Sequence, residues 1–288
     1  MSTAVRPAPA RRRRRRRGGP GWLSWRAPAL VLGALVMLFP LYWMLVTALS
    51  DGGTLTSGPL RFWPESPSLE AFRRAFELLP FGRFFLNSAA IAVVAMALSV
   101  SLNLLAGYVL AKYRFRGRQV VFVLILSTLM IPVQVVMVPQ FQLVAGLGWV
   151  DSYWAVIVPR AAEAFGIFLC RQFMLNIPDE VLEAARMDGA GHLRVFWSIV
   201  LPMCRPLIAV LVILTFMYRW NEFAWPLIVL NDQSLFTVPI GLAFLQGQYG
   251  TDYPALMGMA LVSTLPILAV FAFFQRQFVE GVARSGLR

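Results

Sequence analysis

Few side chains in this sequence can carry out nucleotide, metal or covalent chemistry. The only lysine, Lys112, follows Ala111, whereas a P-loop needs glycine directly before its lysine so that the backbone can wrap phosphate. The only histidine, His192, excludes paired-histidine zinc motifs. The cysteines Cys170 and Cys204 stand beside apolar segments and are expected to pack unpaired as small hydrophobic residues. The sequence therefore predicts a chain that is not an enzyme and that binds no metal ion and no cofactor.

Charged residues are also scarce. Only 14% of the 288 residues are charged, 58% are hydrophobic, and the mean hydropathy is +0.66. A soluble globular protein carries roughly 25% charged residues, so this chain has too few to cover a surface that faces water. The same apolar content excludes a disordered chain. A polytopic membrane protein remains.

The long apolar stretches predict an all-α membrane protein with six transmembrane helices. A bilayer core of about 30 Å needs about 20 apolar residues in helical form. Five stretches meet this requirement, at 27–50, 84–112, 119–145, 206–230 and 255–278. A sixth, at 154–171, is interrupted by Arg160 and Glu163, which share a helix face at their spacing of three. We expect these two residues to form an intramembrane ion pair.

Basic residues orient the six predicted spans. The predicted six-span topology has both termini in the cytoplasm. It puts 20 of the 26 basic residues, but only five of the 14 acidic ones, on cytoplasmic segments. The loop 112–118 carries most weight, because short loops follow the positive-inside rule best. The predicted organisation is a cytoplasmic tail at 1–26, a transmembrane domain at 27–282 and a cytoplasmic tail at 283–288.

Seven consecutive arginines, at 11–17, distinguish the N-terminal tail. Such a run is compatible with a nucleic-acid-binding arm. The interpretation that we favour is a disordered cytoplasmic tail that contacts anionic membrane lipids, with no nucleic acid as partner.

Some polar residues within or near the predicted spans are candidates for a solute pathway. Pro132 and Pro139 are expected to break the third span, and a broken helix at membrane depth frees backbone groups that must face protein or a watery cavity. The pathway candidates are Gln134, Gln140, Asn221 and Glu222. The alternative for Asn221 and Glu222 is simple solvation at the membrane interface. Ser99, Asn103 and Gly107 recur every four residues and predict a helix-packing face, with pathway lining as the alternative.

The segment 178–206 is too long for a simple connection, since most connections have about 4–6 residues. Acidic residues crowd the turns after Pro178, which is typical of a helix start. Asp188 and Gly189 indicate a turn, and a second apolar run follows at 195–201. Two short helices joined at a glycine suit a knob that enters a groove of a partner protein. The physical alternative is a helix that lies on lipid.

This segment resembles the EAA loop of ABC importer permeases. The matching residues are Glu183, Ala184, Ala185, Asp188, Gly189, Ala190, Phe196, Ile199, Leu201, Pro202 and Pro206. Further stretches resemble the carbohydrate branch, specifically the maltose-type second permease: 219–223, 226–227, 247–250, 275–276 and 278–279. The resemblance covers the chain from about residue 27 to the end and leaves out the arginine-rich tail.

The resemblance implies a permease subunit in the inner membrane of a bacterium. Such a permease pairs with a homologous second permease, binds an ABC ATPase dimer on the cytoplasmic side, and receives its solute from an extracytoplasmic solute-binding protein. ATP and Mg²⁺ would bind to the ATPase. The coupling loop, 178–202, would enter a cleft of the ATPase and carry its closure into the spans.

The resemblance also implies roles for single residues of this loop. Glu183 would make a polar contact with the ATPase, Ala184 and Ala185 would permit close approach, and Gly189 would allow the tight turn. The remaining members of the expected coupling set are Asp188, Ala190, Leu201 and Pro202. Two other functions stay open: an ABC permease for another solute class, such as glycerol phosphate or amino acids, and an ion-coupled secondary transporter. The second requires intramembrane carboxylates, for which Glu163 is the candidate.

Overall fold

The computed structural model describes residues 23–50, 62–64, 66–247 and 250–285. They divide between Trp43 and Met44 into two compact units. The first unit contributes most of α1 (Leu23–Ala48), an apolar helix that contains Pro28 and Pro40. The expected tail 1–26 lies outside the described residues except for its last four, and the expected tail 283–288 except for its first three.

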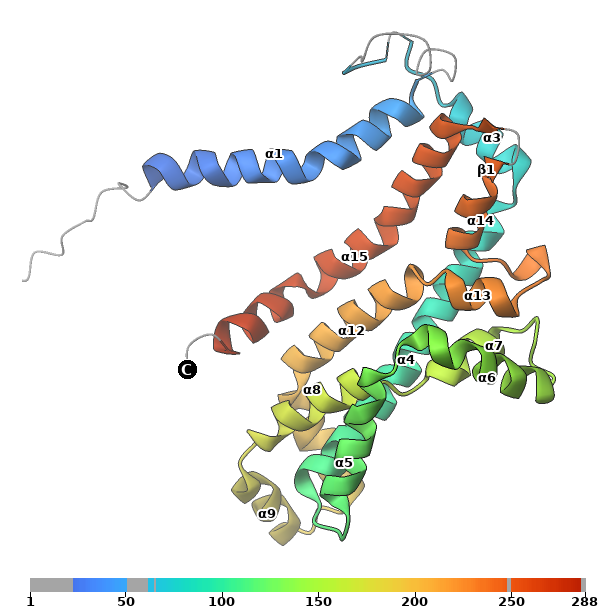
Figure 1. Cartoon of the computed structure of the whole chain (residues 1–288). Helices are drawn as coiled ribbons and strands as arrows, with labels where there is room; N and C mark the ends of the chain where they lie inside the picture. Colours follow the sequence, from blue (N-terminus) through green and yellow to red (C-terminus); the bar gives the residue numbers. More distant parts are fainter. Residues whose placement is uncertain (1–22, 51–61, 65, 248–249, 286–288) are drawn as a thin grey trace, which may run out of the picture. The chain divides into compact units, whose positions relative to one another are not determined.

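The second unit is almost entirely helical, as the sequence predicts (Figure 1). Its α-helices are α3 (Glu70–Leu78), α4 (Phe81–Lys112), α5 (Arg118–Ser127), α6 (Val133–Gly146), α7 (Tyr153–Ile157), α8 (Ala164–Leu175), α9 (Asp179–Met187), α10 (His192–Val195), α11 (Leu201–Met203), α12 (Arg205–Trp220), α13 (Ala224–Val229), α14 (Val238–Phe244) and α15 (Tyr253–Ser285). Shorter turns are η1 (Thr128–Met130), η2 (Val158–Arg160), the π-helical η3 (Phe196–Val200) and η4 (Gln233–Leu235). Strands β1 (Gln246–Gly247) and β2 (Gly250–Thr251) pair as an antiparallel hairpin.

Three helices of the described chain are long and apolar enough to cross a membrane unaided: Ala27–Ala48, Phe81–Lys112 and Tyr253–Gln277. Three helix pairs reach the same length and apolarity together but bend at a break. The bend is 105° between Arg118–Met130 and Val133–Gly146, 44° between Tyr153–Arg160 and Ala164–Leu175, and 79° between His192–Met203 and Arg205–Trp220. The described residues thus supply three spans, or up to six if each bent pair is one span.

Two expectations about the helix breaks need correction. The break expected at Pro132 is confirmed, because this residue precedes α6 and has no N–H to continue a helix. Pro139, however, lies inside α6, as prolines do in membrane helices whose surroundings satisfy the freed backbone group. The stretch 206–230 is not one helix either. Helix α12 ends at Trp220, and the chain turns before α13 begins at Ala224.

Helix α4 is the element against which most of the second unit packs. Helices α8 and α12 lie along it, and α7 and α14 contact it. Ser99, Asn103 and Gly107 do form a packing face: Asn103 Oδ1 accepts the backbone N–H of Glu163 at 3.1 Å, and a Cβ on Gly107 would lie 2.2 Å from that of Cys170. The small residue therefore lets α4 and α8 approach closely.

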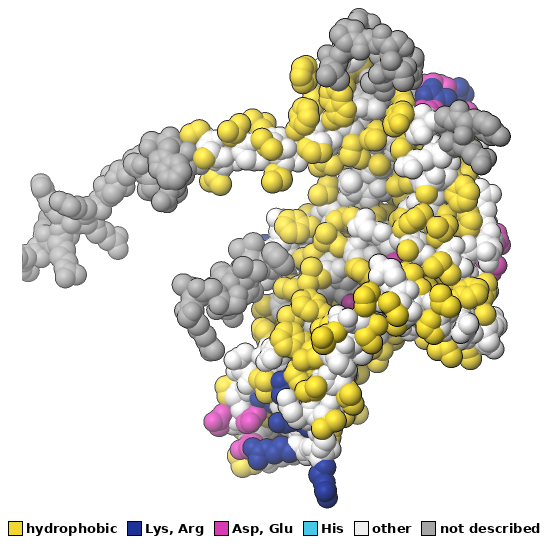
Figure 2. Space-filling model, in the orientation of Figure 1, with side chains coloured by type: hydrophobic (Ala, Val, Ile, Leu, Met, Phe, Trp, Pro, Cys, Tyr) yellow, Lys and Arg dark blue, Asp and Glu magenta, His cyan; other side chains and the backbone are white. Residues whose placement is uncertain are grey.

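The buried side chains form two main clusters along α4. One contains Phe81, Phe84 and Trp225 and lies toward α14, and the other contains Cys170 and Cys204 and lies toward α9. Both cysteines are free and buried, as expected. Figure 2 shows hydrophobic side chains over the middle of the visible face, with charged side chains gathered at the end that carries α9 and beside α3. Such a pattern suits an apolar belt between two polar ends.

Candidate functional site

The segment between α8 and α12 contains the two helical pieces joined at a glycine that the sequence predicts. Helix α9 begins directly after Pro178 and ends at Met187, and the backbone of Gly189 has a φ of +81°. The N–H of Ala190 bonds the carbonyl of Ala185 and the N–H of Gly189 bonds that of Arg186, each at 3.0 Å. This pair of bonds is a Schellman motif, which needs a residue in the left-handed conformation and so favours glycine.

The expected coupling residues fall on two sides of this segment. Glu183, Ala184, Asp188, Gly189 and Pro202 are exposed, whereas Ala190 and Leu201 are half-buried. Ala185 is only 7% exposed and belongs to the same buried cluster as Leu182. Helix α9 is amphipathic and turns Ala185 toward its own core, while Glu183 and Ala184 face outward.

Large apolar side chains stand exposed beside the coupling residues. Met187 is 83% exposed, Leu193 73% and Trp197 59%. Together with Glu183 they give α9, α10 and η3 a surface that is apolar with a polar edge. A surface of this kind, outside the apolar belt, is typical of a protein-binding site or of a segment lying on lipid.

A cavity of about 380 Å³ separates α9 from the end of α4. Its lining combines basic, acidic and aromatic side chains: Lys112, Tyr113, Arg114, Asp179, Leu182, Glu183, Arg186 and His192. The ammonium of Lys112 donates a hydrogen bond to the carboxylate of Asp179 and thereby lowers the pKa of Asp179. Among the described residues, no group of three or more His, Cys, Asp and Glu side chains could hold a metal ion.

Four charged side chains form a cluster where α8 begins and α12 ends, with three of them largely buried and Glu163 half-buried. Arg160 pairs with Glu222, and Arg219 pairs with both Glu163, at 2.8 Å, and Glu222, at 3.3 Å. The expected pairing of Arg160 with Glu163 is therefore wrong. Tertiary packing brings Arg219 and Glu222, at the end of α12, to the break between η2 and α8. There Arg160 pairs with Glu222, and Glu163 pairs with Arg219. The formal charge of the cluster is zero.

Backbone carbonyls and hydroxyl groups also bond to the charge cluster. The guanidinium of Arg219 also donates to the carbonyl of Arg160, and that carbonyl accepts a second hydrogen bond, at 3.2 Å, from the hydroxyl of Ser99 on α4. The other guanidinium, that of Arg160, donates to the hydroxyl of Tyr218 at 2.8 Å. Arg219 was not predicted to belong to this cluster. Its spacing of three from Glu222 is the signal that indicates a pair.

The remaining pathway candidates are Gln140 and Gln134 on α6 and Asn221 at the end of α12. Gln140 donates to the carbonyl of Pro159 at 3.3 Å, which places it beside η2. Asn221 is exposed at the end of α12 and donates to the carbonyl of Met217 at 2.8 Å. Gln134 is exposed on the first turn of α6, directly after the break.

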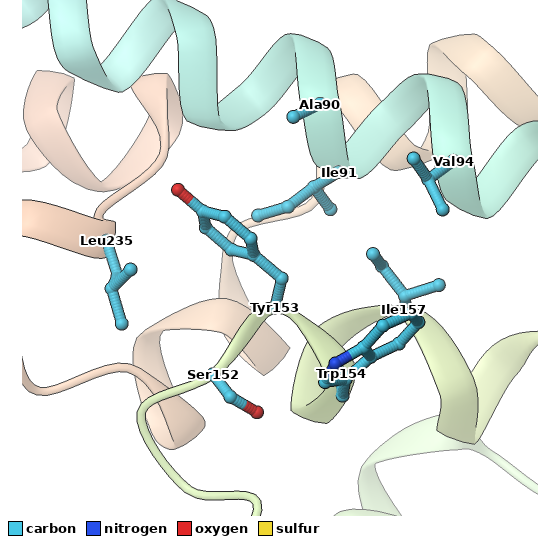
Figure 3. Close-up of a pocket in the computed structure, with 8 residues that line it drawn as sticks. All are labelled: Ala90, Ile91, Val94, Ser152, Tyr153, Trp154, Ile157 and Leu235. Atoms are coloured by element: carbon cyan, nitrogen blue, oxygen red, sulfur yellow. The ribbon is translucent and has the colours of Figure 1, made fainter.

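An apolar pocket of about 430 Å³ lies beside α4. Figure 3 shows Ile91 and Val94 of α4 facing Tyr153 and Trp154 of α7 across it, with Leu235 at one side. The hydroxyl of Tyr153 donates a hydrogen bond to Asn87 Oδ1 at 2.8 Å. The pocket has no cluster of titratable groups and so offers surface for apolar contacts, not chemistry.

Comparison with known proteins shows which family this chain resembles. The family described as "Binding-protein-dependent transport system inner membrane component" matches residues 103–284. The arabinooligosaccharides transport system permease protein AraQ of Bacillus subtilis (strain 168) is 34% identical over 259 residues, which cover 88% of this chain and 92% of AraQ. The sn-glycerol-3-phosphate transport system permease protein UgpE of Yersinia enterocolitica is 36% identical over 265 residues, covering 89% of this chain and 94% of UgpE.

A solved structure agrees with these relatives. A chain in the crystal structure of a bacterial ABC transporter involved in the import of the acidic polysaccharide alginate superposes with a TM-score of 0.77 at 25% identity. The superposition covers 88% of this chain and 95% of that chain. The similarity therefore extends over nearly the whole length of both proteins.

Proposed function

The chain belongs to the family of binding-protein-dependent transport system inner membrane components, and from this premise we propose that it takes up a sugar or sugar-like solute in an ATP-driven importer. As a member it is a multi-pass permease subunit of the inner membrane. The names of AraQ and of the alginate transporter support a saccharide. The name of UgpE supports sn-glycerol 3-phosphate as the second candidate.

The proposed topology has six spans. The three continuous helices and the three bent pairs supply them, with both termini in the cytoplasm, a permease domain at 27–282 and cytoplasmic tails at 1–26 and 283–288. The end of α4 that carries Lys112 then faces the cytoplasm, as does the surface of α9, α10 and η3. The positive-inside rule supports this orientation.

The proposed coupling element is the segment 178–202. Its exposed Glu183, its glycine-terminated helix and its exposed apolar side chains suit insertion into a cleft of an ATPase. The partner ATPase binds ATP and Mg²⁺, and this chain binds neither and is no enzyme. ATP and solute then favour different arrangements of the same helices, which is the thermodynamic requirement for coupling.

The proposed assembly has three further components. A homologous second permease pairs with this chain to enclose the pathway, an ATPase dimer binds on the cytoplasmic side, and an extracytoplasmic solute-binding protein delivers the solute. Membrane lipids surround the apolar belt. On this chain we assign Gln134, Gln140, Asn221 and Glu222 to the pathway, because they lie at or near the helix breaks.

The observation that carries the proposal is the exposed, Schellman-terminated α9 on a member of this family. The test is copurification of the ATPase with the chain carrying Glu183→Lys or Gly189→Asp. We expect both to reduce ATPase binding and uptake, because one reverses a charge on the exposed face and the other puts a side chain where φ is +81°. The control is Glu77→Lys, which reverses the charge of an exposed side chain on α3 and leaves α9 unchanged.

Two outcomes would contradict the proposal. If the wild-type chain brought down no ATPase, the importer assignment would fail. If both variants kept wild-type ATPase binding and uptake, the docking role of α9 would fail. Uptake of labelled arabino-oligosaccharide compared with labelled sn-glycerol 3-phosphate separates the two candidate solutes.

A further inference from the structure

Helix α4 is an uninterrupted rod that joins opposite ends of the unit. Its 32 residues contain no proline and span about 48 Å at 1.5 Å per residue. Among the spans after Trp43 that the structure describes, three are bent pairs and α15 contains Pro266, whereas α4 is continuous. A displacement applied at one end of such a helix is transmitted to the other with little loss.

One end of α4 is bound to the start of the coupling segment by Lys112. Its Nζ donates to the carbonyl of Ile177 at 2.5 Å and to Asp179 Oδ1 at 2.6 Å. The Lys112 side chain is only 5% exposed although it is charged. A buried ammonium requires hydrogen-bond acceptors, and both acceptors lie at the N-terminus of α9. Lys112 thus connects the last turn of α4 to the first turn of α9.

Neighbouring aromatic residues extend this connection to the second half of the segment. The hydroxyl of Tyr113 lies 3.0 Å from Nδ1 of His192, the first residue of α10. The ring of Tyr108 packs against that of Phe196 with centroids 5.1 Å apart. The α4 end therefore contacts both helical pieces that Gly189 joins.

The opposite end of α4 is held as firmly. The Nδ2 of Asn87 donates to the carbonyls of Ser234 and Phe236, each at 2.9 Å. The hydroxyl of Ser88 accepts the backbone N–H of Val238 at 2.8 Å, at the start of α14. Figure 1 shows α9 and α14 toward opposite ends of α4. A movement of α9 consequently has a continuous hydrogen-bonded route to the α14 end.

We infer that Lys112 is a positioning residue for transport, because it ties α4 to the coupling segment so that α9 and α4 move together. The inference rests on the proposed function, since α9 moves only if an ATPase moves it. It goes beyond that function by naming the residue and the helix through which the movement leaves the coupling segment. The competing role for Lys112 is that of one more cytoplasmic positive charge that orients the spans.

The test uses the assembled importer in proteoliposomes, with ATP and Mg²⁺ and with or without its solute-binding protein. We expect Lys112→Met to leave ATPase copurification and unstimulated ATP hydrolysis intact. Stimulation by the binding protein, and uptake of whichever labelled solute the wild type accepts, should fall by about tenfold, within the usual range of coupling effects. Lys112→Arg keeps a cation beside Asp179 and should restore much of both.

The matched control is Arg116→Gln. It removes one positive charge from the same short loop but changes an exposed side chain. Arg116→Gln should behave as wild type, which separates the tie from the effect of charge on orientation. Asp179→Asn provides a second test, because it removes, at an exposed position, the negative charge that pairs with Lys112. We expect it to lower stimulation, and to add little when combined with Lys112→Met.

The outcomes separate the two proposals. A wild-type chain that brings down no ATPase refutes the proposed function. If ATPase copurifies but Lys112→Met retains wild-type stimulation and uptake, the positioning role is refuted. Equal losses in Lys112→Met and Arg116→Gln would also overturn it in favour of orientation by charge. If Lys112→Met does not assemble, wild-type stimulation in Asp179→Asn would overturn it.

Discussion

Substituting Glu222 by glutamine tests the balance of the buried charge cluster. Glu222 accepts from both Arg160 and Arg219, and its side chain is only 6% exposed. The variant keeps the shape and the hydrogen-bonding capacity of the side chain but removes its charge. Arg219 then keeps the carboxylate of Glu163, whereas Arg160 loses its carboxylate partner, and the cluster carries a net charge of +1.

The expected cost follows from burial. The side chain of Arg219 is 1% exposed and that of Arg160 10%, so water cannot replace the lost partner. Removing one partner of a buried ion pair costs about 3–5 kcal/mol, because the other charge stays buried and uncompensated. For a chain of this size such a loss lowers the melting temperature by on the order of 10 °C.

The assay is thermal unfolding of the purified chain, or of its complex, in detergent. The matched control is Glu77→Gln, which also removes a carboxylate beside an arginine, Arg73, but with both side chains more than half exposed. We expect Glu77→Gln to leave the melting temperature nearly unchanged, since exposed pairs contribute little. Adding Arg160→Gln to Glu222→Gln restores charge neutrality and should recover part of the loss.

The reasoning would be refuted if Glu222→Gln unfolded no earlier than Glu77→Gln. It would also be refuted if the double variant unfolded at a temperature that simply adds the two single effects. Either result would mean that the four charges do not interact as a unit in the folded chain. A loss of uptake at normal stability would instead favour the role of Glu222 in the solute pathway.

Two further substitutions test the close packing of α4 and the connection beside α7. Gly107→Ala should destabilise the folded chain by about 1–3 kcal/mol, because its Cβ would lie 2.2 Å from that of Cys170. The control Gly82→Ala lies on the same helix, and its Cβ would meet nothing within 4 Å, so it should not destabilise the chain. Equal melting temperatures of the two variants would contradict this reasoning. Backbone N–H groups at 231–232 lower the pKa of Asp151, so its contribution to stability is present above about pH 4 and lost as the pH falls through that lowered pKa. The melting temperature of Asp151→Asn should therefore lie below that of wild type at pH 7 and approach it near pH 3; a gap that does not change with pH would contradict this.

Local signals predicted much of the fold and of the candidate site. The break at Pro132 follows from the missing N–H of proline, and the turn at Gly189 from a backbone conformation that other residues rarely adopt. The start of α9 after Pro178 follows from the acidic residues in its first turn. Each of these features depends on residues within one or two turns of one another.

Long-range contacts account for what was missed. Arg160 and Glu222 are 62 residues apart, and Arg219 and Glu163 are 56 apart, so only the packing of α8 and α12 along α4 brings them together. The role of Lys112 was missed for the same reason, because its acceptor Asp179 lies 67 residues away. The sequence showed Lys112 only as one of several basic residues in a short loop.

The amino-acid sequence was enough to predict a polytopic helical membrane protein with two short helices in the segment 178–206. Composition and near neighbours in the chain decide which segments are apolar and which backbone conformations they favour. Folding in three dimensions decided which charges compensate one another, which side of α9 is available, and which helix receives its movement. Charge pairing inside an apolar interior depends on distances of a few ångströms between segments far apart in the chain, and such distances exist only once the helices have packed.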